Sequence, residues 1–276
     1  MDSLYQMISE HFAGVFTFGL GRYLIAAGLL SLILWLAKNW SDNRRIQNRR
    51  AGVRDYRREI SSSLRTVFIF GLTSLTTVVM IKFGWVSKLD GPINGWLFGV
   101  QFVAIIVAHD AYFYWMHRGL HLKKMFKFSH LHHHQSRTPT PWAAYSFSPF
   151  EAVTEAAFVP VYLLFLSVIG APIYGLVIAL FLVHMIVRNV MGHAGVELFP
   201  AGWTRGPFRW MTTTTHHDLH HSHGNSNFGL YFTWWDRWMG TEHPEYLAKF
   251  DLAGGNRDAK ILGGEKAAVL SADRAG

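Results

Sequence analysis

Five long hydrophobic stretches constrain the fold of this chain more than any other feature of its sequence. An α-helix needs about 20 apolar residues to cross a bilayer. The stretches run from about Val15 to Ala37, Val67 to Val86, Trp96 to Trp115, Phe150 to Ile169 and Ile173 to Val187. The first three are long enough to span. The last two flank the turn signal Gly170-Ala171-Pro172, so they form either a full helical hairpin or a shallow re-entrant pair.

The composition agrees with a lipid environment. Half of the 276 residues are hydrophobic and only 16% are charged, whereas about 25% is usual for soluble domains. We therefore expect an all-α integral membrane protein with four to five hydrophobic helices. The alternative, a soluble helical bundle with a large core, does not account for the strongly basic loop that follows the first stretch.

The distribution of charge predicts the orientation in the membrane. Nine basic residues and three acidic ones lie between the first two stretches; the basic ones are Lys38, Arg44, Arg45, Arg49, Arg50, Arg54, Arg57, Arg58 and Arg65. The positive-inside rule makes this loop cytoplasmic and the N-terminus external. A hairpin of the last two stretches then leaves the C-terminal region cytoplasmic. Anionic lipid headgroups account for the net charge of +8 better than nucleic acid does, and no nucleic-acid partner is expected.

Histidines carry most of the chemical signal. The chain has no cysteine and 16 histidines, so disulfides, thiolate metal sites and cysteine nucleophiles are excluded and a metal has to use His, Asp or Glu. Two clusters share the spacing H-x-x-H-H, and a pair four residues apart precedes them. The clusters are His130, His133 and His134, and His217, His220 and His221; the pair is His117 and His121.

This spacing has a physical reason. Residues three and four apart share a helix face, and two imidazoles about 6 Å apart along the axis can reach one metal ion, to which the residue at i+3 adds a third nitrogen. Eight nitrogens exceed the roughly four ligands of a closed zinc site, so the clusters indicate two ions with open positions in a histidine-rich helical cap on the cytoplasmic side. Imidazole suits Fe, Zn, Cu and Ni alike, so the metal stays open. Four histidines outside the pattern are not expected to be ligands: His11, His132, His223 and His243.

These clusters and their flanking motifs resemble the fatty acid hydroxylase/sterol desaturase superfamily of membrane di-iron oxygenases. The resemblance covers about Asp110 to Tyr246. Beside the histidine clusters it rests on Asp110-Ala-Tyr-Phe-Tyr-Trp-Met-His117-Arg118, Pro141-Trp142-Ala143-Ala144, Pro149-Phe150-Glu151, Asn189-Val-Met-Gly-His193, Asn227-Phe228-Gly229, Trp235-Asp236-Arg237 and Met239-Gly240-Thr241.

The resemblance implies that the eight clustered histidines and His193 hold two iron ions. It also implies O2-dependent hydroxylation or desaturation of a lipid such as a fatty acyl chain, sterol or carotenoid. No flavin or nicotinamide motif is visible, so an external electron donor is expected: a cytochrome b5-like protein, a ferredoxin or a reductase. Three parts follow: residues 1–95 with the first helices and the basic loop, 96–250 as the hydroxylase-like catalytic domain, and 251–276 as a mobile tail.

One position departs from the family pattern. Many members carry a histidine just before the Pro-x-Glu that is Pro149 to Glu151 here, and this chain has Ser148. His109, eight residues before His117, is either the substitute ligand or a polar residue at a helix end. Asp110 and Asp218 lie beside ligands, where they either fix histidine tautomers or serve as a helix cap or an arginine partner. The same two interpretations apply to Glu151, Glu155 and Glu197.

Two other functions are compatible with clustered histidines. A membrane metal transporter is disfavoured because the stretches are apolar at their centres. A zinc-dependent hydrolase uses about three protein ligands and leaves most of the histidines unexplained. For a lipid substrate we expect an apolar channel at the metal site. Its walls would be the hairpin and Tyr112, Trp115, Trp142, Tyr145 and Phe147.

Overall fold

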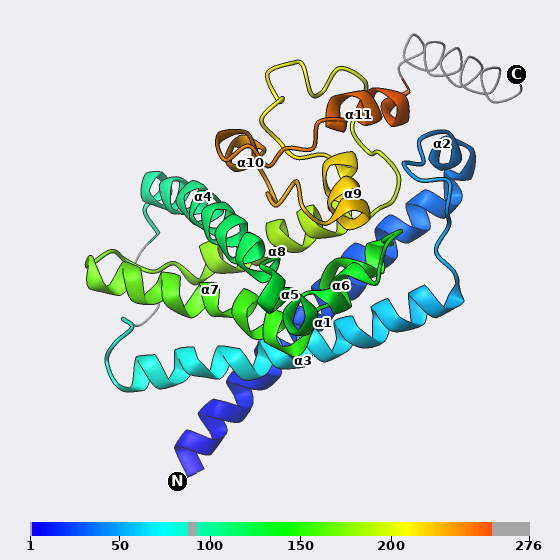
Figure 1. Cartoon of the computed structure of the whole chain (residues 1–276). Helices are drawn as coiled ribbons and strands as arrows, with labels where there is room; N and C mark the ends of the chain where they lie inside the picture. Colours follow the sequence, from blue (N-terminus) through cyan, green and yellow to red (C-terminus); the bar gives the residue numbers. More distant parts are fainter. Residues whose placement is uncertain (1, 88–92, 256–276) are drawn as a thin grey trace, which may run out of the picture.

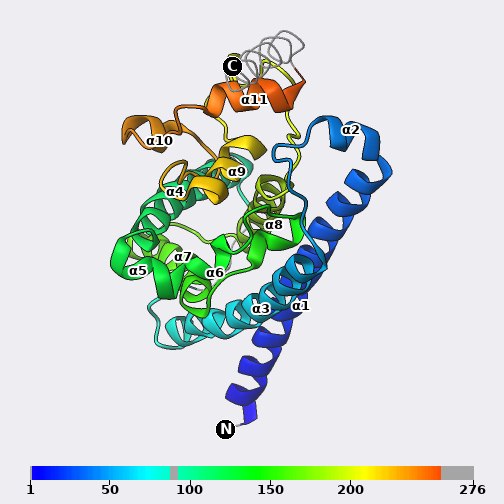
Figure 2. The same ribbon diagram turned by 45° about the vertical axis from the view of Figure 1, so that its right-hand side comes forward.

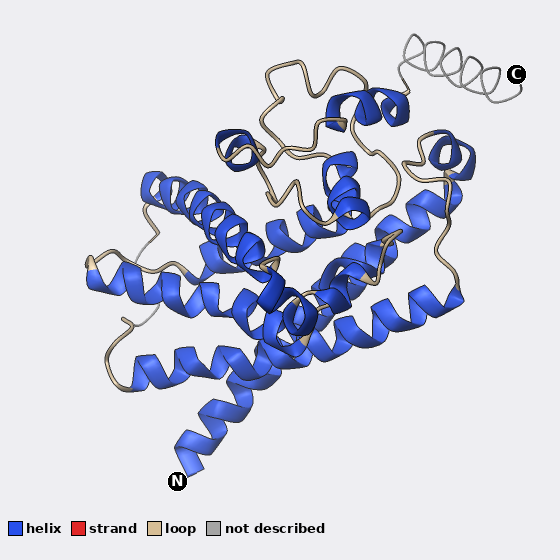
Figure 3. Cartoon of the chain, viewed as in Figure 1, coloured by secondary structure: helices blue, strands red, loops and turns tan. Residues whose placement is uncertain are grey.

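The structure is a computed structural model that describes residues 2–87 and 93–255. The described residues form helices and loops, with two isolated β-bridges and no strand (Figure 3). The expected all-α class is therefore confirmed. Five helices are long and apolar enough to cross a membrane: α1 (Asp2–Leu36), α3 (Val53–Lys82), α4 (Gly95–Leu120), α7 (Pro149–Val168) and α8 (Gly175–Gly192). Helices α7 and α8 are thus each long enough for a full hairpin.

Local sequence signals set the ends of these helices. Ser148 caps α7, because its Oγ accepts from the backbone N of Glu151 at 3.1 Å and Pro149 occupies the first turn. The α7–α8 turn passes through Gly170, whose φ of +67° suits glycine. Helix α3 begins at Val53, well before the apolar stretch, because Asp55 accepts from the backbone N of Gly52 at 3.0 Å. Four of the basic residues expected in the loop therefore lie on α3: Arg54, Arg57, Arg58 and Arg65.

Two apolar cores hold the long helices together. One joins α4, α7 and α8 around Ile105, Phe158 and Phe181. The other joins α1, α3 and α8 around Tyr23 and Val67. Helices α1 and α3 also approach closely elsewhere, since a Cβ at Gly71 of α3 would lie 2.8 Å from the Phe12 ring. Many large apolar side chains face outwards, among them Ile25, Trp35, Phe165 and Val168, as expected for helices surrounded by lipid.

Seven shorter helices connect or follow the long ones in the described residues. They are α2 (Lys38–Asn43), α5 (Lys123–Ser129), α6 (Leu131–His134), the 3-10 helix η1 (Pro141–Tyr145), α9 (Thr214–His223), α10 (Trp234–Trp238) and α11 (Tyr246–Gly254). We call residues 193–255 the cap. Figures 1 and 2 show α9, α10 and α11 at the end opposite the N-terminus, with α2 at the same end as the cap. Asp251 to Gly254, the start of the expected tail, complete α11, and 256–276 lie outside the described residues.

The basic loop is tied to the cap by its first residues. The Arg44 guanidinium donates to the backbone oxygens of Glu197 at 2.7 Å and Gly254 at 2.5 Å, and also to that of Phe199. The backbone N of Ile46 donates to Gly195 O at 3.3 Å. Residues 44–47, which we call the strap, therefore hold the end of α1 against the cap.

Candidate metal centre

Nine histidines converge on one place where the membrane helices meet the cap. They fall into two groups whose ligand nitrogens lie within 4.8 Å of one another. Group A contains His117, His121, His130, His134 and His220, and group B contains His133, His193, His217 and His221. These are the nine histidines that the sequence analysis expects to hold metal ions, and their side chains lie close together in the structure.

The two H-x-x-H-H clusters divide between the groups in opposite ways. In the first cluster the i and i+4 residues, His130 and His134, enter group A, and His133 at i+3 enters group B. In the second cluster His217 and His221 enter group B, and His220 at i+3 enters group A. At about 100° per residue, positions i+3 and i+4 point about 100° apart on a helix. Each cluster therefore serves two sites, which corrects the expectation that its three nitrogens serve one ion.

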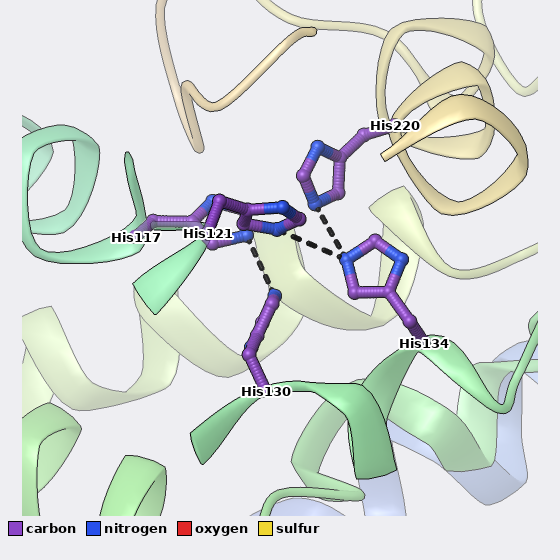
Figure 4. Close-up of side chains that lie close together, drawn as sticks. All are labelled: His117, His121, His130, His134 and His220. Carbon is purple, nitrogen blue, oxygen red and sulfur yellow. Dashed lines mark hydrogen bonds between the residues drawn. The ribbon is translucent and has the colours of Figure 1, made fainter. Parts of the chain in front are cut away.

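Group A is built from the end of α4, the α6 turn and α9 (Figure 4). The Nε2 atoms of His117 and His130 are 3.0 Å apart. That of His134 lies 3.1 Å from His121 and 3.0 Å from His220. All five rings point to one centre, and only His121 is more than slightly exposed.

Group B centres on His193, which directly follows α8. Its Nε2 lies 3.2 Å from that of His133 and 3.1 Å from those of His217 and His221. Residue 192 is glycine where α8 passes α9, and a Cβ there would lie 3.4 Å from the His217 ring. The two groups adjoin, because the His134 and His221 rings are 5.1 Å apart.

Oxygen acceptors meet the outer Nδ1 atoms of several rings. His117 Nδ1 is 3.0 Å from Phe228 O, His193 Nδ1 is 2.7 Å from Asn189 O, and His220 Nδ1 is 2.7 Å from Ser226 O. An Nδ1–H that donates to a carbonyl leaves Nε2 as a bare lone pair. Lone pairs about 3 Å apart repel one another unless a cation lies among them, so the donor set fits metal ions.

Glu151 places a carboxylate oxygen beside His130, in an ion-pair contact rather than a hydrogen bond. Its Oε1 lies 2.7 Å from His130 Nδ1, and both side chains are buried. From the sequence, Glu151 could not be distinguished from Glu155 and Glu197 as the partner of a ligand histidine. The capping motif could have singled out Glu151 in the sequence, because Ser148 and Glu151 together cap the start of α7. This capping position brings Glu151 close to His130.

Burial keeps the imidazoles neutral, which is the form that binds metals. It lowers the pKa of His193 to about 4 and that of His134 to about 3. For His217, His220 and His221, burial is the main cause of pKa values well below 6.5, and the neighbouring imidazoles add to the effect.

Three predicted site residues are not brought to the histidine groups. His109 Nδ1 lies 3.0 Å from the Tyr231 hydroxyl, and its ring packs between Phe158 and Phe181. It therefore does not replace a ligand at Ser148, whose hydroxyl instead donates to the backbone oxygen of Ser129.

Asp110 and Asp218 contact no ligand imidazole. Asp110 accepts from the backbone N of Tyr231 at 2.9 Å and from Trp234 Nε1 at 2.8 Å, so it fixes the loop before α10. Asp218 accepts from Gln47 Nε2 at 2.8 Å, because it lies on the α9 face that meets the strap. Burial raises the pKa of Asp218 to about 7. The proposed tautomer-fixing role of both residues is not supported by these contacts.

An apolar cavity of about 230 Å³ lies next to the groups within the membrane helices. It reaches group A through Phe113, whose ring centroid is 4.9 Å from that of His117. It reaches group B through Phe147, 5.2 Å from the His133 ring. Of the expected walls, Tyr145, Phe147 and the α7–α8 hairpin line the cavity, whereas Tyr112, Trp115 and Trp142 do not.

Comparisons with known proteins agree on one family. The fatty acid hydroxylase family matches residues 102–241, about half of the chain. Lathosterol oxidase from Mus musculus is 32% identical over 68% of this chain and 61% of its own length. A Delta(7)-sterol 5(6)-desaturase from Aspergillus fumigatus is 27% identical over 68% of this chain and 63% of its own. Another desaturase of that name and organism is 26% identical over 91% and 70%. No solved structure matches significantly. The chain spans about three fifths of the length of most of these curated relatives.

Proposed function

Because this chain belongs to the fatty acid hydroxylase family, we propose that it is a membrane oxidoreductase that uses two iron ions and O2 to oxidise a C–H bond of a lipid. The observation that carries this proposal is the pair of imidazole groups, five nitrogens and four, side by side. Iron bound there would supply the O2 chemistry that no amino-acid side chain can perform.

The protein's own contribution is to fix the imidazoles. Glu151 and the backbone oxygens of Asn189, Ser226 and Phe228 hold four rings from outside. These contacts come from α7, α8 and the loop after α9, so they brace the centre from both the membrane and the cap. Such outer contacts orient ligands and raise their basicity.

The apolar cavity supports a lipid substrate. Its walls come from α1, α3, α4, α7 and α8, and aromatic and aliphatic side chains predominate. Keeping a hydrocarbon out of water is worth about 0.8 kcal/mol per CH2, so a chain of eight carbons gains about 6 kcal/mol by staying in apolar surroundings. Curated relatives named as sterol desaturases and lathosterol oxidase make a sterol the first candidate. Fatty acyl chains and carotenoids are the other candidates, and hydroxylation and desaturation are both within the proposal.

The alternatives fit the site less well. A zinc hydrolase needs about three protein ligands, and nine imidazoles converge here. A transporter needs polar groups along a path through the membrane, whereas the two imidazole groups adjoin each other at one place.

Electrons would come from a separate protein, either cytochrome b5-like, a ferredoxin or a reductase. The basic residues of α5, Lys123, Lys124 and Lys127, lie just before the first histidine cluster and suit an acidic partner. Helix α2, which begins the basic loop, lies at the same end of the molecule as the cap. By the positive-inside rule we propose that the metal centre faces the cytoplasm.

Two measurements test the function together. The purified protein should contain close to two iron ions per chain. Lipids from cells that express the active protein should contain a species heavier by 16 mass units or lighter by 2. About one zinc per chain with no change in lipids would contradict the proposal.

A further inference from the structure

A second cavity, of about 270 Å³, lies outside the metal centre where α1 ends. Ser31, Leu34 and Trp35 of α1 line one side, and residues 194–196 of the cap line the other. The candidate membrane span of α1 ends at Leu36, and the Trp35 side chain is 70% exposed. Tryptophan at a helix end is typical of the membrane–water interface. In a bilayer crossed by α1, this interfacial pocket would therefore be level with lipid headgroups.

The charge of the interfacial pocket favours an anion. Lys38, Arg45 and Arg50 line it together with one acid, Asp42, which gives three positive charges against one negative. Asp42 pairs with two arginines at once. The Nη2 atoms of Arg45 and Arg50 lie 3.2 Å and 3.0 Å from the same Asp42 carboxylate oxygen. Lys38 has no ion-pair partner in the described part of the chain. An excess of two positive charges therefore remains for a ligand.

Unpaired donors point to the same ligand. Arg45 Nε is buried and has no hydrogen-bond partner among residues 2–87 and 93–255. The hydroxyls of Ser31 and Thr138, both lining the pocket, are also buried and without partners there. Thr138 is only 7% exposed. Buried donors left unpaired are destabilising, and a phosphate group offers several acceptor oxygens at once.

We propose that the interfacial pocket binds the phosphate of an anionic phospholipid, whose acyl chains run along α1 past Leu34 and Trp35. Free phosphate shares the headgroup chemistry, but the exposed apolar side of α1 next to the pocket favours a lipid. This site is separate from the metal centre and does not depend on the proposed oxidation. The bound headgroup would hold together the end of α1, the strap and the segment that follows His193.

Binding can be measured directly by native mass spectrometry of the full chain in detergent. Phosphatidylglycerol, phosphatidylcholine and glycerol phosphate are titrated separately onto the wild type, Arg45→Gln and Arg54→Gln. Arg54→Gln is the matched control, because it removes the same charge as Arg45→Gln at an exposed residue outside the pocket. Each basic residue near a membrane surface contributes about 1 kcal/mol to anionic-lipid binding. We therefore expect roughly fivefold weaker phosphatidylglycerol binding for Arg45→Gln and less than twofold for Arg54→Gln.

The three ligands separate the possible outcomes. The proposal requires phosphatidylglycerol to bind more tightly than both phosphatidylcholine and glycerol phosphate. Glycerol phosphate binding as tightly as the lipid would overturn it in favour of a soluble phosphate site. Equal losses in the two variants would overturn it in favour of general surface attraction. Circular dichroism and iron content, unchanged in Arg45→Gln, show that the fold and the metal centre survive the substitution.

Discussion

Replacing Glu151 by glutamine should weaken one metal site and spare the other. Glu151 contacts only His130 among the nine imidazoles, at 2.7 Å, and His130 belongs to group A. Glutamine keeps an oxygen that can accept from Nδ1 and keeps the length that caps α7, but it removes the negative charge. Loss of an outer partner typically costs 10- to 100-fold in metal affinity or activity. We expect about 10-fold for Glu151→Gln, or about 1.4 kcal/mol, and about 100-fold for Glu151→Ala.

The assay is a chelator titration of the iron-loaded protein that follows the metal remaining per chain. In Glu151→Gln one ion should leave at about tenfold lower chelator concentration while the second stays at the wild-type position. Glu155→Gln is the matched control, because Glu155 lies one turn further along α7 and belongs to neither histidine group. Release of both ions together in Glu151→Gln, or an identical shift in Glu155→Gln, would refute the division into two groups.

Four further outcomes are expected. His220→Ala should abolish lipid oxidation while membrane insertion stays normal, since His220 lies on α9 outside the spans; unchanged turnover would remove it from the ligand set. Asn48→Cys, exposed in the basic loop of a chain without native cysteine, should react with an impermeant thiol reagent only after cells are opened, and labelling of intact cells would reverse the topology. Ala156→Trp, which places an indole in the apolar cavity, should reduce lipid turnover severalfold with iron content unchanged. The metal-free protein should lose stability as the pH falls from about 6.5 towards 4, because burial lowers the pKa of His193 to about 4 and the folded state therefore favours neutral imidazoles; a melting temperature that is flat across this range would contradict it.

The sequence alone predicted the membrane helices and most of the histidines that lie together in the structure. Both depend on local patterns: the length of an apolar run decides whether a helix can span, and the H-x-x-H-H spacing places imidazoles together on one side of a turn. Eight of the nine histidines were therefore predictable from their spacing, whereas His193 was expected only from the family resemblance. Helix α3 begins at Val53, well before the apolar stretch that predicted it. Its first turns are polar, and the capping contact between Asp55 and Gly52 sets its start rather than hydrophobicity.

The tertiary structure decided which histidine joins which group and which carboxylate supports it. His133 and His134 are neighbours in the chain and belong to different groups, because the second ligands of each group come from distant helices that no local spacing encodes. For the same reason Asp218, which follows His217 directly, contacts the strap, and Asp110, two turns before His117, contacts the loop before α10. Glu151 meets His130 from 21 positions further along the chain. Proximity in sequence fixes a residue's height along a helix, but only the packing of helices fixes which side chain it meets.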